Sequence, residues 1–315
     1  MAQAQRIAHK VIDFPDTRSL YFQAEDIRRE RTGVHAKVLI YLTKAEGSPV
    51  LLGWDNCNVE RQEERTRLVN AAHKELSPQL QSFIAANELR HHLNVWTARL
   101  WDSYLETLVA QPVVPNLEIQ GIRFLAKSLA LDAGGTFLFS PPGKGKTYTA
   151  LLLAISIDAG SSALWPVEKA VVMFVNLERS AKSIAHRILC VNTSLGLPID
   201  RPLLVLNARG RRLVDLMPAL EISIRKHKVE YVIVDSISRA GAGDLNNNQP
   251  ANSAVDMLNN ACPAWLGIAH TPRADESHIF GSTFFEAGAD IMVKLASERS
   301  SATQMGISLQ ITKAN

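Results

Sequence analysis

The segment 136–150, TFLFSPPGKGKTYTA, constrains the fold of this chain more than any other segment. It begins as an apolar run, passes through two prolines, and then brings two glycines, two lysines and a threonine together. This order predicts a buried strand, a tight loop and a helix. Gly145, Lys146 and Thr147 match the end of the pattern G-x-x-x-x-G-K-[ST], whereas Ser140 stands at its first glycine. Because such a loop presents backbone N–H groups and a helix N-terminus, it predicts a phosphate-binding site.

The predicted loop assigns a role to each of its polar residues. The Lys146 ammonium is expected to reach the β and γ phosphates of ATP, and the Thr147 hydroxyl to bind Mg²⁺. The first glycine of the pattern forms a tight turn, and the small Ser140 before a rigid Pro-Pro pair can form the same turn. The alternative is an ordinary strand-to-helix loop with a solvated lysine. The candidate nucleotide-binding residues are Pro142, Gly143, Lys144, Gly145, Lys146, Thr147 and Tyr148.

Composition sets wide bounds on the class of protein. The 315 residues are 46% hydrophobic, which is enough for one large domain or two smaller ones. A formal charge of +3 permits nucleic acid as a partner without arguing for it. The three cysteines lie far apart and form no metal-binding spacing, so reduced thiols inside a cell are expected. With no apolar stretch of about 18 residues and no apolar signal core at the start, a cytoplasmic protein without a membrane partner is predicted.

The first third of the chain predicts a small α+β module over residues 1–112. Two β-rich runs within 34–58 surround KAEGSP and predict a hairpin, and a charged helix is expected over 59–76. Apolar residues between 89 and 108 recur at helical spacing and predict one long helix. The prolines of QPVVPN mark the boundary. The sequence does not define the role of this module, and docking of an oligomer or partner is one hypothesis. Its basic run DIRRERTGVHAK either contacts phosphates or forms a solvated surface.

Residues 113–315 predict an α/β domain in which strands and helices alternate. Several of the expected strands are apolar throughout, which is typical of a mainly parallel sheet with helices on both faces. Helices are expected at 180–189 and 211–228, between the earlier strands. The expected strands are 136–140, 170–177, 202–206, 231–236, 265–270, 290–295 and 307–312.

Three of these strands end at a polar residue that is suited to nucleotide chemistry. In open α/β sheets ligands bind at the carboxyl ends of the strands. Asp235 closes one apolar strand and is expected to hold the water shell of Mg²⁺. Glu178 is expected to orient or deprotonate an attacking water, and His270 to sense the γ-phosphate. The alternatives are a turn-capping aspartate, a helix-start glutamate and a structural histidine.

Residues 113–315 resemble the RecA/DnaB-type P-loop ATPases, particularly the hexameric helicase-like proteins of plasmids and phages. Four ordered elements carry the resemblance: SPPGKGKT, FVNLERSAKSIAHRI, VIVDSISRA and IAHTPRADESHIFGSTFFEAGADIMVKL. The second contains a late arginine, Arg187, and the fourth contains the pairs Gly281-Ser282 and Ala289-Asp290. The resemblance implies a RecA-like P-loop NTPase core with ATP and Mg²⁺ as its ligands.

The resemblance also assigns residues. It implies Lys146 and Thr147 on nucleotide and metal, Asp235 on Mg²⁺ through water, Glu178 as the base and His270 as the sensor. It further implies that loops near 239–253 and 272–280 face a central channel and contact single-stranded DNA. The candidate contacts in those loops are Arg239, Arg273 and the asparagines Asn246 to Asn248.

The end of the chain departs from the family. The family commonly completes a neighbour's ATP site with a basic pair spaced Lys-x-Arg on a late strand. Here Lys313 fits the first position, but Asn315 stands at the second. We therefore expect Lys313 to act on the neighbour's nucleotide. Three alternatives account for the missing arginine charge: another residue such as Arg299 supplies it, the natural chain continues, or catalysis is weak.

Three functions follow from these expectations. The first is a DnaB/RepA-like helicase or translocase, a homo-oligomer with a hexameric ring favoured, moving on single-stranded DNA in plasmid, phage or mobile-element replication with partner proteins. The second is a recombinase-like ATPase in which nucleotide controls filament assembly. The third is a KaiC-like scaffold, which the lack of a serine/threonine-rich tail disfavours. Few aromatic residues in the channel loops leave the first two open.

Overall fold

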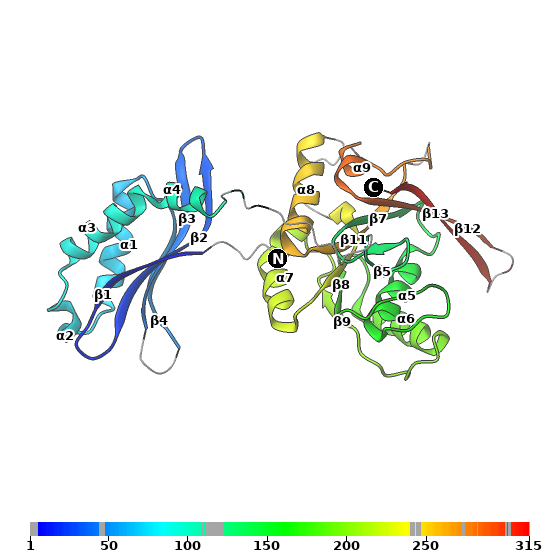
Figure 1. Ribbon diagram of the computed structural model, residues 1–315, viewed down its shortest axis with the longest axis horizontal. Coiled ribbons are helices and arrows are strands. Elements are labelled where there is room, and N and C mark those ends of the chain that lie inside the picture. The colour runs from blue at the N-terminus through cyan, green and yellow to red at the C-terminus, as the bar shows by residue number, and fades with distance from the viewer. Residues whose placement is uncertain are drawn as a thin grey trace. The chain divides into compact units, whose positions relative to one another are not determined.

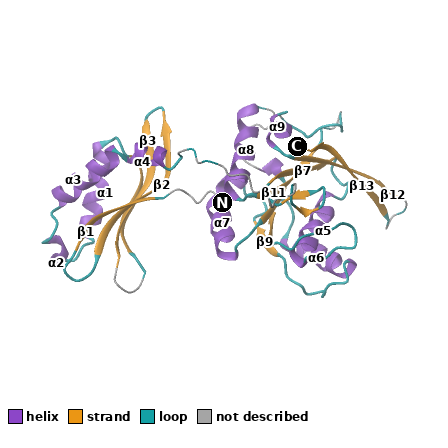
Figure 2. Ribbon diagram, in the orientation of Figure 1, coloured by secondary structure: helices purple, strands orange, loops and turns teal. Residues whose placement is uncertain are grey.

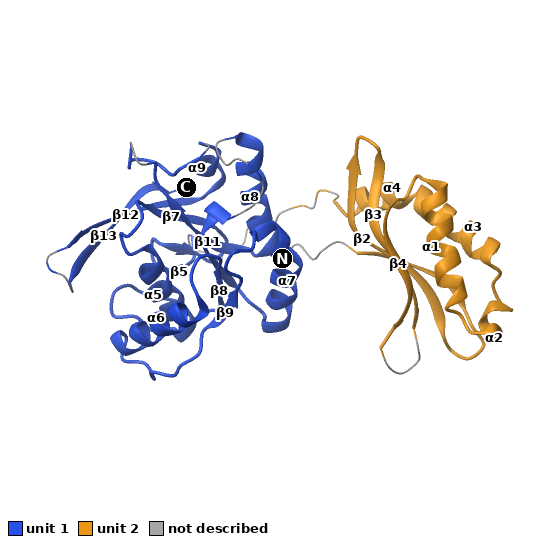
Figure 3. Cartoon of the chain, turned by 180° about the vertical axis from the view of Figure 1, so that it is seen from behind, with its two compact units in different colours: residues 1, 116–315 blue, residues 2–115 orange. Residues whose placement is uncertain are grey.

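The computed structural model describes residues 6–43, 48–108, 110, 112, 122–239, 243, 247–272, 275–281, 283–299, 301 and 304–314 (Figure 1). The chain divides into two compact units (Figure 3). We call residues 2–115 the N-terminal unit and residues 116–315 the core unit. Each unit is described by itself.

The N-terminal unit is built on a four-stranded antiparallel sheet in the order β1-β2-β3-β4. Its strands are β1 (Ile7–Asp13), β2 (Ser19–Glu30), β3 (Gly33–Thr43) and β4 (Val50–Asn58). The predicted hairpin of residues 34–58 is the pair β3–β4. Strands β1 and β2 were not predicted, although alternate residues of β2 such as Leu20, Phe22 and Ala24 are buried. That alternation is the mark of a strand with one covered face.

Helices cover one face of this sheet (Figure 2). They are α1 (Gln62–Lys74), α2 (Pro78–Gln81), α3 (Ala86–Ala98) and α4 (Leu100–Glu106). The single long helix predicted for 89–108 is wrong, because the chain leaves helical geometry at Arg99 with φ −106° and ψ 0°. Two residues earlier, the Thr97 hydroxyl donates to the Leu93 carbonyl at 2.8 Å. A threonine hydroxyl bonded in this way bends a helix, and the chain leaves helical geometry shortly afterwards.

The core unit contains a seven-stranded sheet in the order β13-β12-β7-β11-β10-β8-β9. Each predicted strand corresponds to one of its members. All neighbours are parallel except β12 and β13, which form an antiparallel hairpin at one edge. The strands are β7 (Gly134–Ser140), β8 (Val172–Asn176), β9 (Leu204–Asn207), β10 (Tyr231–Asp235), β11 (Ala264–His270), β12 (Ile291–Arg299) and β13 (Met305–Ala314). Two short strands, β5 (Phe124–Ala126) and β6 (Ala130–Leu131), form a separate pair.

Helices cover both faces of the seven-stranded sheet. Helices α5 (Lys146–Ala159) and α6 (Ala181–Ser194) pack in one hydrophobic cluster, and α7 (Leu213–His227) and α8 (Asn248–Ala261) in another. Strand β10 shows why its sequence is apolar throughout. Its residues contribute alternately to the two clusters, with Ile233 in the first and Val232 and Val234 in the second. The predicted α/β class with a mainly parallel sheet covered on both faces is therefore confirmed.

Parallel pairing also fixes where polar residues can meet. The carboxyl ends of β7, β8, β10 and β11 lie at one edge of the sheet, and the chain leaves each of them there. The short helices η1 (Ile237–Arg239) and α9 (Phe284–Gly288) follow β10 and precede β12. None of the helices in the described part of the chain combines the length and apolar composition that a membrane span needs.

Candidate functional site

The glycine-lysine loop between β7 and α5 adopts a tight conformation that depends on its glycines. Gly143 and Gly145 have φ values of +79° and +101°, which disfavour residues with a side chain. At Gly145 a Cβ atom would also lie 3.2 Å from the Ile307 side chain of β13. Gly145 is the N-cap residue of α5, and Lys146 is the first residue of that helix. The loop therefore directs a helix N-terminus toward the carboxyl edge of the sheet.

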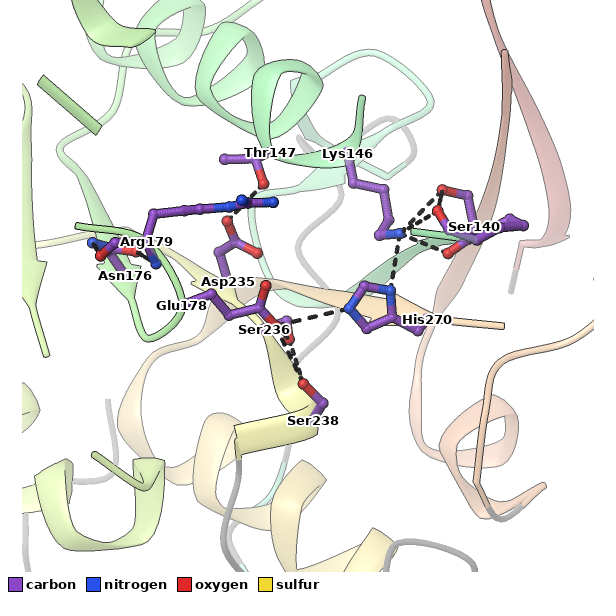
Figure 4. Close-up of polar contacts among 11 residues, drawn as sticks. Ser140, Lys146, Thr147, Asn176, Glu178, Arg179, Asp235, Ser236, Ser238 and His270 are labelled. Carbon is purple, nitrogen blue, oxygen red and sulfur yellow. Dashed lines mark hydrogen bonds and ion pairs between the residues drawn. The ribbon is translucent and has the colours of Figure 1, made fainter. Parts of the chain in front are cut away.

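Lys146 is folded back onto its own loop (Figure 4). Its Nζ atom donates to the carbonyls of Ser140 at 2.6 Å and Pro141 at 2.9 Å, and it lies 3.2 Å from the Ser140 hydroxyl and from His270 Nδ1. Ser140 thus offers the lysine a hydroxyl acceptor that the usual glycine lacks. Burial lowers the pKa of Lys146 to about 8, although two nearby carboxylates act to raise it.

Half-buried Thr147 and buried Asp235 bring two oxygen atoms together. The Thr147 hydroxyl donates to Asp235 Oδ2 at 2.8 Å, and Asp235 is 2% exposed at the end of β10. Burial raises the pKa of Asp235 to about 6, against the effect of the Thr147 hydrogen bond. The described residues contain no cluster of three or more His, Cys, Asp or Glu side chains that could hold a metal ion. One carboxylate and one hydroxyl nevertheless fit Mg²⁺, which is usually held by one or two carboxylates together with substrate phosphates and waters.

Glu178 lies just beyond the end of β8 and accepts several polar contacts. Its Oε1 accepts hydrogen bonds from the Ser236 hydroxyl and, at 3.3 Å, from the Ser238 hydroxyl. The same oxygen is 3.8 Å from His270 Nε2. His270 and then Ser236 are the partners that hold the pKa of Glu178 down, to about 2. The carboxylate is consequently ionised at neutral pH and suited to orienting a polar group.

His270 connects the loop lysine with Glu178 (Figure 4). A lysine ammonium only donates hydrogen bonds, so His270 Nδ1, at 3.2 Å from it, has to accept. This assignment places the ring proton on Nε2, the nitrogen that faces Glu178. The five residues that the sequence singled out therefore lie in one site as two connected sets: Lys146, His270 and Glu178 form one, and Thr147 and Asp235 form the other.

The other predicted loop residues point elsewhere. Lys144 directs its Nζ to the Ser297 carbonyl of β12 at 3.5 Å. Tyr148 is 40% exposed on α5, and the Arg187 guanidinium of α6 lies over its ring at 4.4 Å. Pro142 and Gly143 form the turn that leads to Gly145.

Lys313 is occupied within its own chain. Its Nζ donates to the Glu286 and Ala289 carbonyls at 2.6 Å each. These carbonyls lie at the C-terminal end of α9, where a cation is favoured. Two of the three donors of its ammonium are therefore used within the chain, and a role on a neighbour's nucleotide stays a prediction.

The predicted DNA contacts are only partly covered by the structure. Arg239 is exposed at the end of η1, and Asn248 begins α8 after its N-cap residue Asn247. Arg273, Asn246, Ser282 and Asn315 lie outside the described residues. The positions of these residues do not test DNA binding, which stays a prediction.

Sequence reasoning missed Asn176. It is fully buried at the end of β8, and its side chain holds the next turn: Oδ1 accepts from the Arg179 N–H at 2.9 Å, and Nδ2 donates to the Arg179 carbonyl at 2.8 Å. Nδ2 also donates to Asn207 Oδ1 at 3.0 Å. The available signal was a polar residue closing the otherwise apolar run VVMFVN, since buried amides are rarely left without partners.

Part of the core unit matches a known domain family. Residues 122–275 match the AAA domain family, and this region contains the glycine-lysine loop, Glu178, Asp235 and His270. The search of curated proteins finds no significant match. The AAA domain match supports a nucleotide-hydrolysing ATPase and implies nucleotide binding. It identifies a broader class than the RecA/DnaB-type resemblance drawn from the sequence.

Proposed function

We propose that the core unit binds ATP with Mg²⁺ and hydrolyses it. The observation that carries this proposal is the convergence of Lys146, Thr147, Glu178, Asp235 and His270 at one edge of a parallel sheet. Three of them, Lys146, Glu178 and Asp235, carry charges that are wholly or partly buried; burial of a charge costs stability, and such groups cluster at functional sites.

Phosphate binding follows from the geometry of the loop. The backbone N–H groups at the start of α5 and the Lys146 ammonium offer donors to an anion at the same place. In the structure, the carbonyls of Ser140 and Pro141 accept hydrogen bonds from Lys146. Binding exchanges these neutral acceptors for charged phosphate oxygens, which make stronger hydrogen bonds with an ammonium.

Thr147 and Asp235 are the residues that would hold Mg²⁺. When bound there, the metal ion would supply positive charge that offsets the charge of the phosphates. Asp235 has to be ionised for this role, and with a pKa of about 6 it is mostly ionised at neutral pH. Its hydrogen bond from Thr147 already places the two ligand oxygens 2.8 Å apart.

Glu178 and His270 are suited to the chemical step. Glu178 orients the attacking water, and the hydroxyls of Ser236 and Ser238 hold its carboxylate in place. When Lys146 turns to a phosphate it withdraws its hydrogen bond from His270 Nδ1. His270 then becomes free to move relative to Glu178, so occupancy of the phosphate site is reported to the water-orienting carboxylate.

The nucleobase has a candidate platform beside the loop. Tyr148 presents an exposed ring one residue beyond Thr147, and its stacked partner Arg187 adds a second planar group. Flat aromatic and guanidinium surfaces stack well with bases. We include Tyr148 in the proposed nucleotide site on this ground.

Lys146→Ala tests the proposed ATPase most simply. We expect the variant to fold and to lose binding of a fluorescent ATP analogue by at least about 100-fold, because the ammonium contact to phosphate is lost. Wild-type protein should release phosphate from ATP in the presence of Mg²⁺. Unchanged analogue affinity in a folded Lys146→Ala variant would contradict the phosphate-loop assignment.

The finer proposal is a DnaB/RepA-like oligomeric motor on single-stranded DNA. Its support is the ordered resemblance of the four sequence elements and the position of the loops after β10 and β11. Those loops leave the sheet at the edge that carries Glu178 and His270. A DNA strand bound to the loops would therefore lie close enough to influence the ATP site. A recombinase-like or KaiC-like ATPase is the alternative.

Single-stranded DNA separates these functions. A motor should hydrolyse ATP several-fold faster with single-stranded DNA and appear as closed rings in electron micrographs. A filament on DNA favours the recombinase-like function. A rate and an assembly state that ignore DNA favour the scaffold function.

A further inference from the structure

Arg179 directs a positive charge into the site from the residue next to Glu178. Figure 4 shows the two side chains diverging: Glu178 points to His270 and Ser236, and Arg179 extends toward Thr147 and Asp235. Two consecutive residues therefore bring opposite charges to two parts of the same site. The glutamate was predicted from its strand end, but no role was predicted for the arginine.

The backbone of Arg179 is fixed on both sides. The buried Asn176 side chain bonds its N–H and its carbonyl at 2.9 Å and 2.8 Å. The following residue, Ser180, is the N-cap of α6, and its hydroxyl accepts from the Ser183 N–H at 3.2 Å. The root of the Arg179 side chain is thus held in place by groups that do not depend on the guanidinium.

The guanidinium itself is not used by the protein. In the part of the chain that the structure describes, it forms no hydrogen bond and no ion pair, and Arg179 is exposed. Its charge is nevertheless close enough to Asp235 to lower the pKa of that carboxyl, against the larger effect of burial. A guanidinium with five N–H donors and no protein partner in the described chain can bind a planar or tetrahedral anion.

The charge balance of the site leaves a place for such a group. Lys146 approaches the loop from the side of Ser140 and His270, and Arg179 from the side of Thr147 and Asp235. Phosphoryl transfer needs positive charge on the transferring group, and arginine is often its source. The other candidate cation, Lys313, already donates to two backbone carbonyls.

We propose that Arg179 is a phosphate-binding catalytic residue supplied by the same chain, whose guanidinium contacts the γ-phosphate of the bound nucleotide. This inference rests on the proposed ATPase function. A divalent cation held by Thr147 and Asp235 would repel the Arg179 guanidinium from that carboxylate and leave the nucleotide phosphate as its anionic partner. The positive charge at the γ-phosphate would then come from the same chain, without a residue of a neighbouring subunit.

The test is Arg179→Gln in the full-length chain, with Lys182→Gln as a control. Lys182 is exposed on α6 and loses the same charge three residues away. We expect Arg179→Gln to lower kcat by about 10²-fold or more, within the range known for catalytic arginines. Independently of turnover, its affinity for a non-hydrolysable ATP analogue should fall about tenfold while its ADP affinity changes less than twofold. Arg179→Lys should fall between wild type and Arg179→Gln, because an ammonium keeps the charge but not the paired donors.

Subunit mixing decides whether the arginine acts within its own chain. A mixture of Lys146→Ala and Arg179→Gln proteins should recover no activity, because each chain lacks a part of its own site. Recovery in the mixture would show that Arg179 acts on a neighbour and would overturn the proposal, as would unchanged kcat and analogue affinity in Arg179→Gln. If wild-type protein neither binds nor hydrolyses ATP, the proposed function itself fails; if only the arginine variant is normal, this inference alone fails.

Discussion

The N-terminal unit and the core unit differ in where their buried polar residues lie and in what these residues contact. In the described part of the N-terminal unit, the buried polar side chains are Asn58 and Thr97, and each bonds a nearby backbone carbonyl. In the core unit, buried or nearly buried Lys146, Asp235 and Ser236 gather where parallel strands end. The first arrangement closes local structure, whereas the second keeps charges together at a cost in stability. The contrast indicates that the chemistry of the protein lies in the core unit.

This difference has a topological origin. An antiparallel sheet with one covered face directs alternate residues to solvent, so its charged residues need not be buried. In a parallel sheet covered on both faces, the strands are apolar throughout and polar residues are confined to the strand ends. Because the ends of β7, β8, β10 and β11 coincide, these polar residues become neighbours.

Asp235→Asn should sharpen the contrast most strongly. The folded-state pKa of Asp235 is raised from 3.8 to about 6, so ionisation of Asp235 destabilises the folded state. This loss of stability increases between about pH 4 and pH 6 and reaches its full value above pH 6. Asparagine avoids the cost, so the variant should be more stable than wild type at pH 7.5, by at most about 3 kcal/mol, and equal to it near pH 4. At the same time its Mg²⁺ affinity with nucleotide should fall about 10- to 100-fold.

Thermal unfolding at both pH values and Mg²⁺ titration of nucleotide binding measure this trade-off. A variant that is less stable than wild type at pH 7.5 would show that Asp235 is a structural residue, and the contrast between the two units would lose its main example.

Leu93→Ala probes the other side of the comparison. Leu93 is fully buried between α3 and the sheet of the N-terminal unit, and its truncation should cost about 2 to 5 kcal/mol in that unit. Leu93→Met should cost less than about 1.5 kcal/mol. Because the core unit has its own hydrophobic clusters, we expect nucleotide affinity to stay within twofold in both variants. Urea unfolding and analogue binding test this, and a nucleotide affinity that falls with stability would mean that the site depends on the N-terminal unit.

Lys313→Ala should have the smallest effect of the three. Loss of two bonds from an ammonium to backbone carbonyls should lower stability by about 1 to 3 kcal/mol, with kcat at saturating ATP unchanged. Lys226→Ala, on an exposed stretch of α7, is the matched control. If the wild-type rate per subunit rises with protein concentration and the variant loses only that rise, Lys313 acts on a neighbour's nucleotide.

The sequence predicts the core fold because its strands are uniformly apolar and its loop carries a specific pattern. The alternation of Leu20, Phe22 and Ala24 in β2 was an available signal for that strand, whereas β1 has no regular alternation and no glycine or proline marks the break at Arg99. Residues with chemistry of their own, such as Glu178, can be selected from their strand ends.

Partnerships across the sequence are harder to foresee. The contact between Lys146 and His270 joins residues 124 positions apart, and the Asn176 side chain acts on the backbone of Arg179. Such contacts depend on strand order and loop conformation, which periodicity does not specify.

Glu178→Gln tests the central claim most directly, namely that the carboxyl edge of the core sheet is an ATP-hydrolysing site. The amide preserves the size of the side chain but cannot act as a base or orient water as a carboxylate does. We predict that the variant binds the fluorescent ATP analogue with wild-type affinity, within about threefold, while phosphate release falls by about 10²-fold or more. Undiminished phosphate release from a folded Glu178→Gln protein would contradict the account.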